Sequence, residues 1–143
     1  VLLANVMLNA IDGKTKRTMT VPCGDVMAQD GNYVQSVAPE FVAIKLGNGA
    51  VTPDMLALDL HAVTVEAPAN VTGAQLIARV KEAATKGTMA NFTFHGIGGD
   101  YLTVSNEAHE ELLQHLASQP DVYWVDTFLN IMKYVKQQQA LSE

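Results

Sequence analysis

The fold of this chain is decided by the stretch FTFHGIGGDY, which covers residues 92–101. A short apolar run ends at His95, a glycine-rich turn follows at once, and a helix signal begins at Ser105. This order predicts a strand over Met89–His95, then a tight loop, then a helix. In α/β proteins, catalytic and ligand-binding residues lie mainly where loops leave the carboxyl ends of the strands. His95 is therefore a candidate functional residue; the alternative is a hydrogen-bonded histidine that caps a strand.

The composition is that of a folded globular protein. The chain has 143 residues, 48% of them hydrophobic and 17% charged, with one cysteine and a net charge of −6. This length suffices for one domain with its own core, so we predict a single domain over residues 1–143. No cluster of Lys or Arg occurs, which argues against nucleic acid and anionic membranes as partners. No apolar run is long enough to span a bilayer.

Apolar spacing and capping residues predict helices that alternate with strands. The predicted helices are Val1–Ile11, Tyr33–Ala38, Thr72–Lys86, Ser105–Ser118 and one that begins after Thr127, with a frayed tail over Gln137–Glu143. The predicted strands are Arg17–Val21, Phe41–Leu46, Ala57–Val65, Met89–His95 and Val122–Val125. Such alternation predicts an α/β fold with mostly parallel strands.

Two of these helices have detailed signals. Thr72 and Gln75 have the spacing of a capping box, and Gly87 stands where a helix C-terminus favours glycine. In the helix that Ser105 begins, the residues predicted to form the buried face are Ala108, Leu112, Leu113 and Leu116.

The remaining histidines do not suggest a metal site. His109 and His115 lie six residues apart on one predicted helix and point in different directions, so we expect both on the solvated surface. His61 could approach His95 across the sheet or simply pack there. Asp126 follows the last predicted strand and is either a site residue or part of a helix cap.

Three stretches in combination resemble the polysaccharide deacetylase family, the NodB-homology carbohydrate esterases. The first is RTMTVPCGD (residues 17–25), which is similar to the family's strand followed by a Pro-x-Gly loop. The second is FTFHGIG (residues 92–98), similar to its late apolar strand that ends in histidine. The third runs from Tyr101 through WVDTF (residues 124–128) to Tyr134, similar to the strand, Thr-Phe and amphipathic helix that end many members.

The resemblance implies a distorted (β/α) barrel that removes acetyl groups from an acetylated polysaccharide with a divalent metal such as zinc. It implies that His95 is the general acid, a role that suits a side chain whose charge changes near neutral pH. The residues implied to line the substrate groove are Pro22, Cys23, Gly24, Gly96 and Ile97. From the residues alone, Cys23 is either a nucleophile or, more commonly, a small buried residue. The substrate class implies an extracytoplasmic or secreted location.

The family's metal-binding motifs are missing from the sequence. Members hold the metal with an aspartate and a pair of histidines on early strands, but no Asp-Asp pair and no His-x-x-x-His occurs here. These motifs should precede Arg17. We therefore expect either the C-terminal part of a deacetylase domain, with its early strands missing, or a degenerate relative.

Three expectations about binding follow from the missing motifs. The chain alone should bind no catalytic metal ion. It should pair either with the missing N-terminal part of its own protein or with a second copy as a homodimer. The alternative function is an inactive carbohydrate-binding or interaction module with the same fold.

Overall fold

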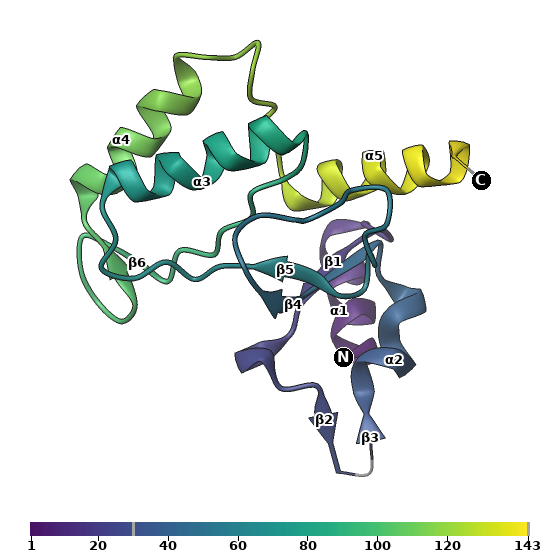
Figure 1. Ribbon diagram of the computed structural model, residues 1–143. Helices are drawn as coiled ribbons and strands as arrows, with labels where there is room; N and C mark the ends of the chain where they lie inside the picture. Colours follow the sequence, from purple (N-terminus) through teal and green to yellow (C-terminus); the bar gives the residue numbers. More distant parts are fainter. Residues whose placement is uncertain (30, 143) are drawn as a thin grey trace. The chain divides into compact units, whose positions relative to one another are not determined.

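The computed structural model describes residues 1–29 and 31–142 and has a mixed α/β fold (Figure 1). The α-helices in these residues are α1 (Leu2–Asp12), α2 (Tyr33–Val37), α3 (Gly73–Lys86), α4 (Asn106–Ala117) and α5 (Phe128–Leu141). The strands are β1 (Thr18–Thr20), β2 (Met27–Ala28), β3 (Gly31–Asn32), β4 (Ala43–Asn48), β5 (Val63–Val65), β6 (Gly96–Ile97) and β7 (Thr103–Val104). Two short 3-10 helices, η1 (Pro22–Gly24) and η2 (Ala38–Glu40), complete the elements.

The largest sheet has three strands in the order β1–β4–β5. β1 and β4 run parallel, with Thr18 opposite Ala43 and Thr20 opposite Lys45. β2 pairs with β3 antiparallel, and β6 pairs with β7 parallel. The predicted α/β class with parallel strand pairing is therefore confirmed. The strands in the described residues do not close into a barrel, and the distorted barrel stays a prediction.

The chain divides into two compact units, and each is described by itself. Unit 1 contains Val1–Gly47, Leu56–Val63 and Thr127–Glu143. Unit 2 contains Asn48–Met55 and Thr64–Asp126. The single domain expected from the sequence stays a prediction.

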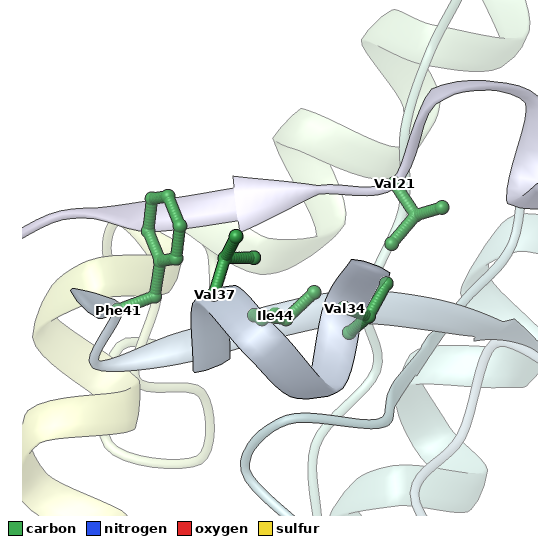
Figure 2. Packing of buried hydrophobic residues seen from close by; sticks show 5 residues of the cluster. All are labelled: Val21, Val34, Val37, Phe41 and Ile44. Atoms are coloured by element: carbon green, nitrogen blue, oxygen red, sulfur yellow. The ribbon is translucent and has the colours of Figure 1, made fainter. Parts of the chain in front are cut away.

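The core of unit 1 lies between α2 and the strands β1 and β4. Its buried residues are Val21, Val34, Val37, Phe41 and Ile44 (Figure 2). Val34 and Val37 lie three residues apart, so α2 presents both on one face. Asn32 begins this helix, because its side chain accepts a hydrogen bond from the backbone N–H of Val34 at 2.9 Å.

Helix α1 forms as predicted, but none of its residues is buried. It ends because Gly13 takes a left-handed conformation, with φ 69°, and donates its N–H to the carbonyl of Asn9. Side chains at helical spacing along α1 are exposed, among them those of Leu3, Val6 and Ile11. The partner expected to cover such an apolar face, further sequence of the same protein or a second copy, stays a prediction.

An ion pair fixes the chain between α1 and β1. Two nitrogens of Arg17 donate to the two carboxylate oxygens of Asp12, at 2.6 and 3.2 Å. The hydrogen bond from Arg17 is the main cause that lowers the pKa of Asp12 below its ordinary value of 3.8. Because the folded-state pKa is lowered, this pair stabilises the fold above the ordinary pKa, and its contribution is lost as the pH falls through the lowered value.

The core of unit 2 lies between α3 and α4, which run side by side (Figure 1). Leu76 and Val80 of α3 pack there with Leu112 of α4. The predicted capping box is confirmed, since the Thr72 side chain accepts from the Gln75 backbone while the Gln75 side chain accepts from the Thr72 backbone. The helix cap predicted at Ser105 is also confirmed.

The strand predicted over Ala57–Val65 is wrong for most of its length, because only Val63–Val65 is a strand. Asp59 turns the chain instead. Its carboxylate accepts the backbone N–H of His61 at 2.8 Å, and its carbonyl accepts that of Ala62 at 3.0 Å. An aspartate that satisfies the backbone locally competes with strand pairing.

The strand predicted over Val122–Val125 is wrong altogether. The backbone N–H groups of Val122 and Tyr123 both donate to the carbonyl of Gln119, which bends the chain at this point. The β-branched side chains that suggested a strand are exposed, and strand propensity has little effect where no neighbouring strand offers hydrogen bonds.

Smaller corrections concern the ends and faces of elements. The strand predicted over Phe41–Leu46 is shifted to Ala43–Asn48. Leu113, predicted to be buried, is 50% exposed, because one residue after the buried Leu112 it lies about 100° further around α4. The fraying predicted over Gln137–Glu143 is wrong as far as Leu141, where α5 ends, and Glu143 lies outside the described residues.

Candidate functional site

The segment that leads to the candidate site is not the regular strand predicted over Met89–His95. Ala90 forms an antiparallel bridge with Val51, whereas Phe92 forms a parallel bridge with Glu66. The backbone therefore changes its hydrogen-bonding neighbour within two residues. This prevents a continuous ladder, and the strand prediction is wrong, although the segment remains extended between two neighbours.

His95 lies directly before β6 in unit 2, with its side chain exposed. Its ring meets that of Tyr101 nearly edge-on, with 6.3 Å between the ring centres and 74° between the planes. Tyr101 is itself 73% exposed. The imidazole can therefore exchange a proton with a molecule that arrives from solvent beside an aromatic ring.

Tyr101 lies in the loop between β6 and β7, whose backbone is strained, whereas His95 lies directly before β6. Gly96 pairs with Thr103 across the two short parallel strands. Asp100 and Leu102, on either side of Tyr101, have φ values of 76° and 49°. This left-handed region costs free energy for a residue with a side chain, and for a bulky leucine it is a clear outlier. Strain of this kind is characteristic of functional sites.

Glycine is required at two positions of this loop. A Cβ atom on Gly96 would collide with the backbone carbonyl oxygen of Gly99, whereas one on Gly98 would displace the side-chain amide of Asn106. Gly98 also has φ 76°. Gly96 and Gly99 take part in the same turn without a positive φ.

We expect Gly98→Ala to lower the free energy of unfolding by about 1–3 kcal/mol, because it combines a left-handed backbone with a clash against Asn106. Gly99→Ala is the matched control. A Cβ there meets open space, so the change should stay within about 0.5 kcal/mol. Urea denaturation of both variants measures this. Equal destabilisation would contradict the described loop geometry.

A hollow of about 700 Å³ lies beside the same loop. It is lined by residues 70–73, 98–99 and 103–108 and by Glu111, and so contains the carboxyl groups of Glu107 and Glu111 of α4. The pKa of Glu107 is lowered, mainly by its own backbone N–H and then by the hydroxyl of Ser105. The two carboxyl groups that line this open hollow can accept hydrogen bonds from hydroxyl donors.

Pro22, Cys23 and Gly24, predicted to line a substrate groove, form η1 in unit 1. Cys23 has a left-handed backbone with φ 53°, and its thiol is exposed and free. The packing role expected for this cysteine is therefore wrong. Pro22 lines a hollow of about 850 Å³ together with residues of α1 and β1. Since Gly96 and Ile97 belong to unit 2, one groove formed by all these residues stays a prediction.

The surface positions expected for His109 and His115 are wrong, because both are half-buried in unit 2. The ring of His109 packs edge-on against Phe94, with 4.9 Å between the centres. Nε2 of His115 lies 3.0 Å from the hydroxyl of Tyr123. Through these contacts, both histidines help to pack α4 against neighbouring segments of unit 2.

The two remaining candidates, His61 and Asp126, lie outside regular strands. His61 lies in the turn that Asp59 forms, not in a strand, and its Nε2 is 3.2 Å from the carbonyl oxygen of Phe41. Thr127 is the N-cap of α5, as predicted, because its side chain accepts from Asn130. The role of Asp126, directly before this cap, stays a prediction.

Two residues were missed by sequence reasoning. Tyr101 was not assigned a role, although an aromatic residue just after a glycine-rich turn is a usable signal. Lys45 is half-buried in β4, with its Nζ 4.8 Å from the ring centre of Phe128. Burial lowers the pKa of Lys45 below its ordinary value of 10.5. In the sequence, Lys45 could have been noticed as a single charged residue within an apolar run. Its contact with the Phe128 ring explains Lys45 as a packing residue.

No group of three or more His, Cys, Asp or Glu residues within residues 1–29 and 31–142 could hold a metal ion. None of the helices described there is long and apolar enough to cross a membrane. Comparison of the chain with family models, with curated proteins and with solved structures finds no match. The resemblance to polysaccharide deacetylases therefore rests on the three sequence stretches alone.

Proposed function

We propose that this chain supplies the proton donor of a metal-dependent polysaccharide deacetylase, an enzyme that hydrolyses N- or O-acetyl groups on a carbohydrate polymer. The observation that carries the proposal is the exposed His95 beside the exposed Tyr101 on a strained loop. An imidazole with this access can protonate a leaving group, and such general acid catalysis contributes about 10²–10⁴-fold to a rate.

The hydrolysis breaks the bond between the acetyl carbon and the sugar nitrogen or oxygen. The leaving amine or alkoxide takes up a proton, and His95 is the residue proposed to donate it. The divalent metal of the resembled family supplies an activated water to such a reaction. The described residues contain no group of three or more His, Cys, Asp or Glu that fits that metal, and we propose proton donation and sugar binding near His95 as the contribution of this chain.

A carbohydrate-binding module without catalysis is the second candidate. The exposed aromatic rings of Tyr101 and Trp124 favour it, because such rings can stack on sugars whether or not a reaction follows. The two candidates share a ligand class and differ only in turnover.

Acetate release tests the proposal. The gene product that contains this chain is incubated with N-acetylchitotetraose and, separately, with acetylated xylan. We expect acetate from at least one substrate, loss of activity after treatment with EDTA, and recovery when zinc is added back. Binding of both carbohydrates without any acetate release would contradict the deacetylase and would support the binding module.

A further inference from the structure

We propose that Tyr101 is a binding platform for a single sugar residue, on which a pyranose ring stacks so that its acetylated substituent meets His95. The identity of the ligand as a carbohydrate rests on the proposed function. The assignment of Tyr101 as a platform rests on three observations: its exposed ring, its ring contact with His95, and the left-handed backbone of its two neighbours.

Hydrophobicity alone would not leave this side chain in water. Tyr101 is 73% exposed, whereas the smaller Leu102 beside it is half-buried. Exposure of a large aromatic face carries a free-energy cost that burial would remove. The loop thus half-buries the leucine and leaves the tyrosine ring open to a molecule that arrives from solvent.

The backbone fixes the tyrosine in this orientation. Both neighbours, Asp100 and Leu102, take left-handed conformations, and the N–H of Tyr101 donates to the Asp100 carboxylate at 2.8 Å. Below the loop, the pairing of Gly96 with Thr103 closes its base. Strained residues persist only where the surrounding structure holds them, and they are found at ligand clamps.

The chemistry of the ring fits a sugar. A pyranose has an apolar face of C–H groups and a rim of hydroxyl groups, so it can lie on the negative face of an aromatic ring while its rim stays hydrogen-bonded. The hydroxyl of a tyrosine adds a donor and an acceptor at the edge of the platform. The 6.3 Å between the ring centres of His95 and Tyr101 is a distance that one sugar residue and its substituent can span.

Binding measurements test the platform without catalysis. N-acetylchitotetraose is titrated by calorimetry into the EDTA-treated gene product, which should not hydrolyse it, for the natural sequence and for Tyr101→Ala, Tyr101→Phe and Tyr134→Ala. We expect Tyr101→Ala to weaken binding about tenfold and Tyr101→Phe to stay within about twofold, because phenylalanine keeps the stacking face. Tyr134, another exposed tyrosine that lies on α5, is the matched control and should leave the Kd unchanged.

Kinetics separate this inference from the proposed function. In the acetate assay, Tyr101→Ala should raise KM for the tetrasaccharide about tenfold. If Tyr101→Ala weakens binding but the natural sequence releases no acetate, the deacetylase proposal is contradicted and the platform is supported. Acetate release with an unchanged Kd and KM in Tyr101→Ala would overturn the platform and keep the deacetylase. Absence of any binding to the tetrasaccharide or to acetylated xylan would overturn both.

Discussion

Replacement of His95 by alanine should lower the rate of deacetylation by about 10²–10⁴-fold, because it removes the group proposed to protonate the leaving atom. The fold should survive, since the side chain of His95 is exposed and its one described ring contact is the edge contact with Tyr101. Turnover of the gene product on its best acetylated substrate measures the first expectation, and thermal unfolding measures the second.

Two further variants sharpen this prediction. His95→Gln keeps a polar side chain of similar size that cannot transfer a proton, so it should be as inactive as His95→Ala. His115→Gln is the control, because His115 also contacts a tyrosine through α4 packing but lies outside the proposed site. Its turnover per folded molecule should be unchanged. Full activity in His95→Ala or in His95→Gln would reduce His95 to a structural residue.

Leu112→Ala should be the most destabilising single truncation on α4. Leu112 is 3% exposed and packs against Leu76 and Val80 of α3. Removal of a buried leucine side chain costs about 2–5 kcal/mol, a large share of the roughly 5–15 kcal/mol that stabilises an ordinary domain. Urea denaturation followed by circular dichroism measures the loss.

The adjacent Leu113 supplies the matched control for this experiment. It has the same side chain on the same helix but is 50% exposed, so Leu113→Ala should cost less than about 1 kcal/mol. Similar losses in the two variants would mean that α4 does not present Leu112 to α3. A larger loss in Leu113→Ala would support the wider buried face expected from the sequence.

The helices could be predicted because their signals are local. The capping box of Thr72 and Gln75 and the left-handed Gly13 act within one turn of their own helix, so neither depends on a distant partner. Strands depend on a neighbour. Residues 122–125 have strand-forming side chains and yet remain irregular, because hydrogen bonds from another strand are what a strand requires.

The candidate site could be predicted only in part, for the same physical reason. The position of His95 beside a glycine-rich turn was readable from residues 92–101. The presentation of Tyr101 was not, because it depends on the left-handed conformation of Leu102, which the sequence preferences of leucine argue against. The packing of His109 on Phe94 was also missed, since it depends on how α4 lies against an extended segment.

The central claim is that His95 donates a proton in the removal of acetyl groups from a polysaccharide. The most direct measurement is the acetate released from N-acetylchitotetraose and from acetylated xylan, by the gene product with His95 and by its His95→Ala variant, each supplied with zinc. The account predicts acetate from the natural sequence and about 10²–10⁴-fold less from the variant. Equal acetate release by the two proteins, or none by the natural sequence, would contradict it.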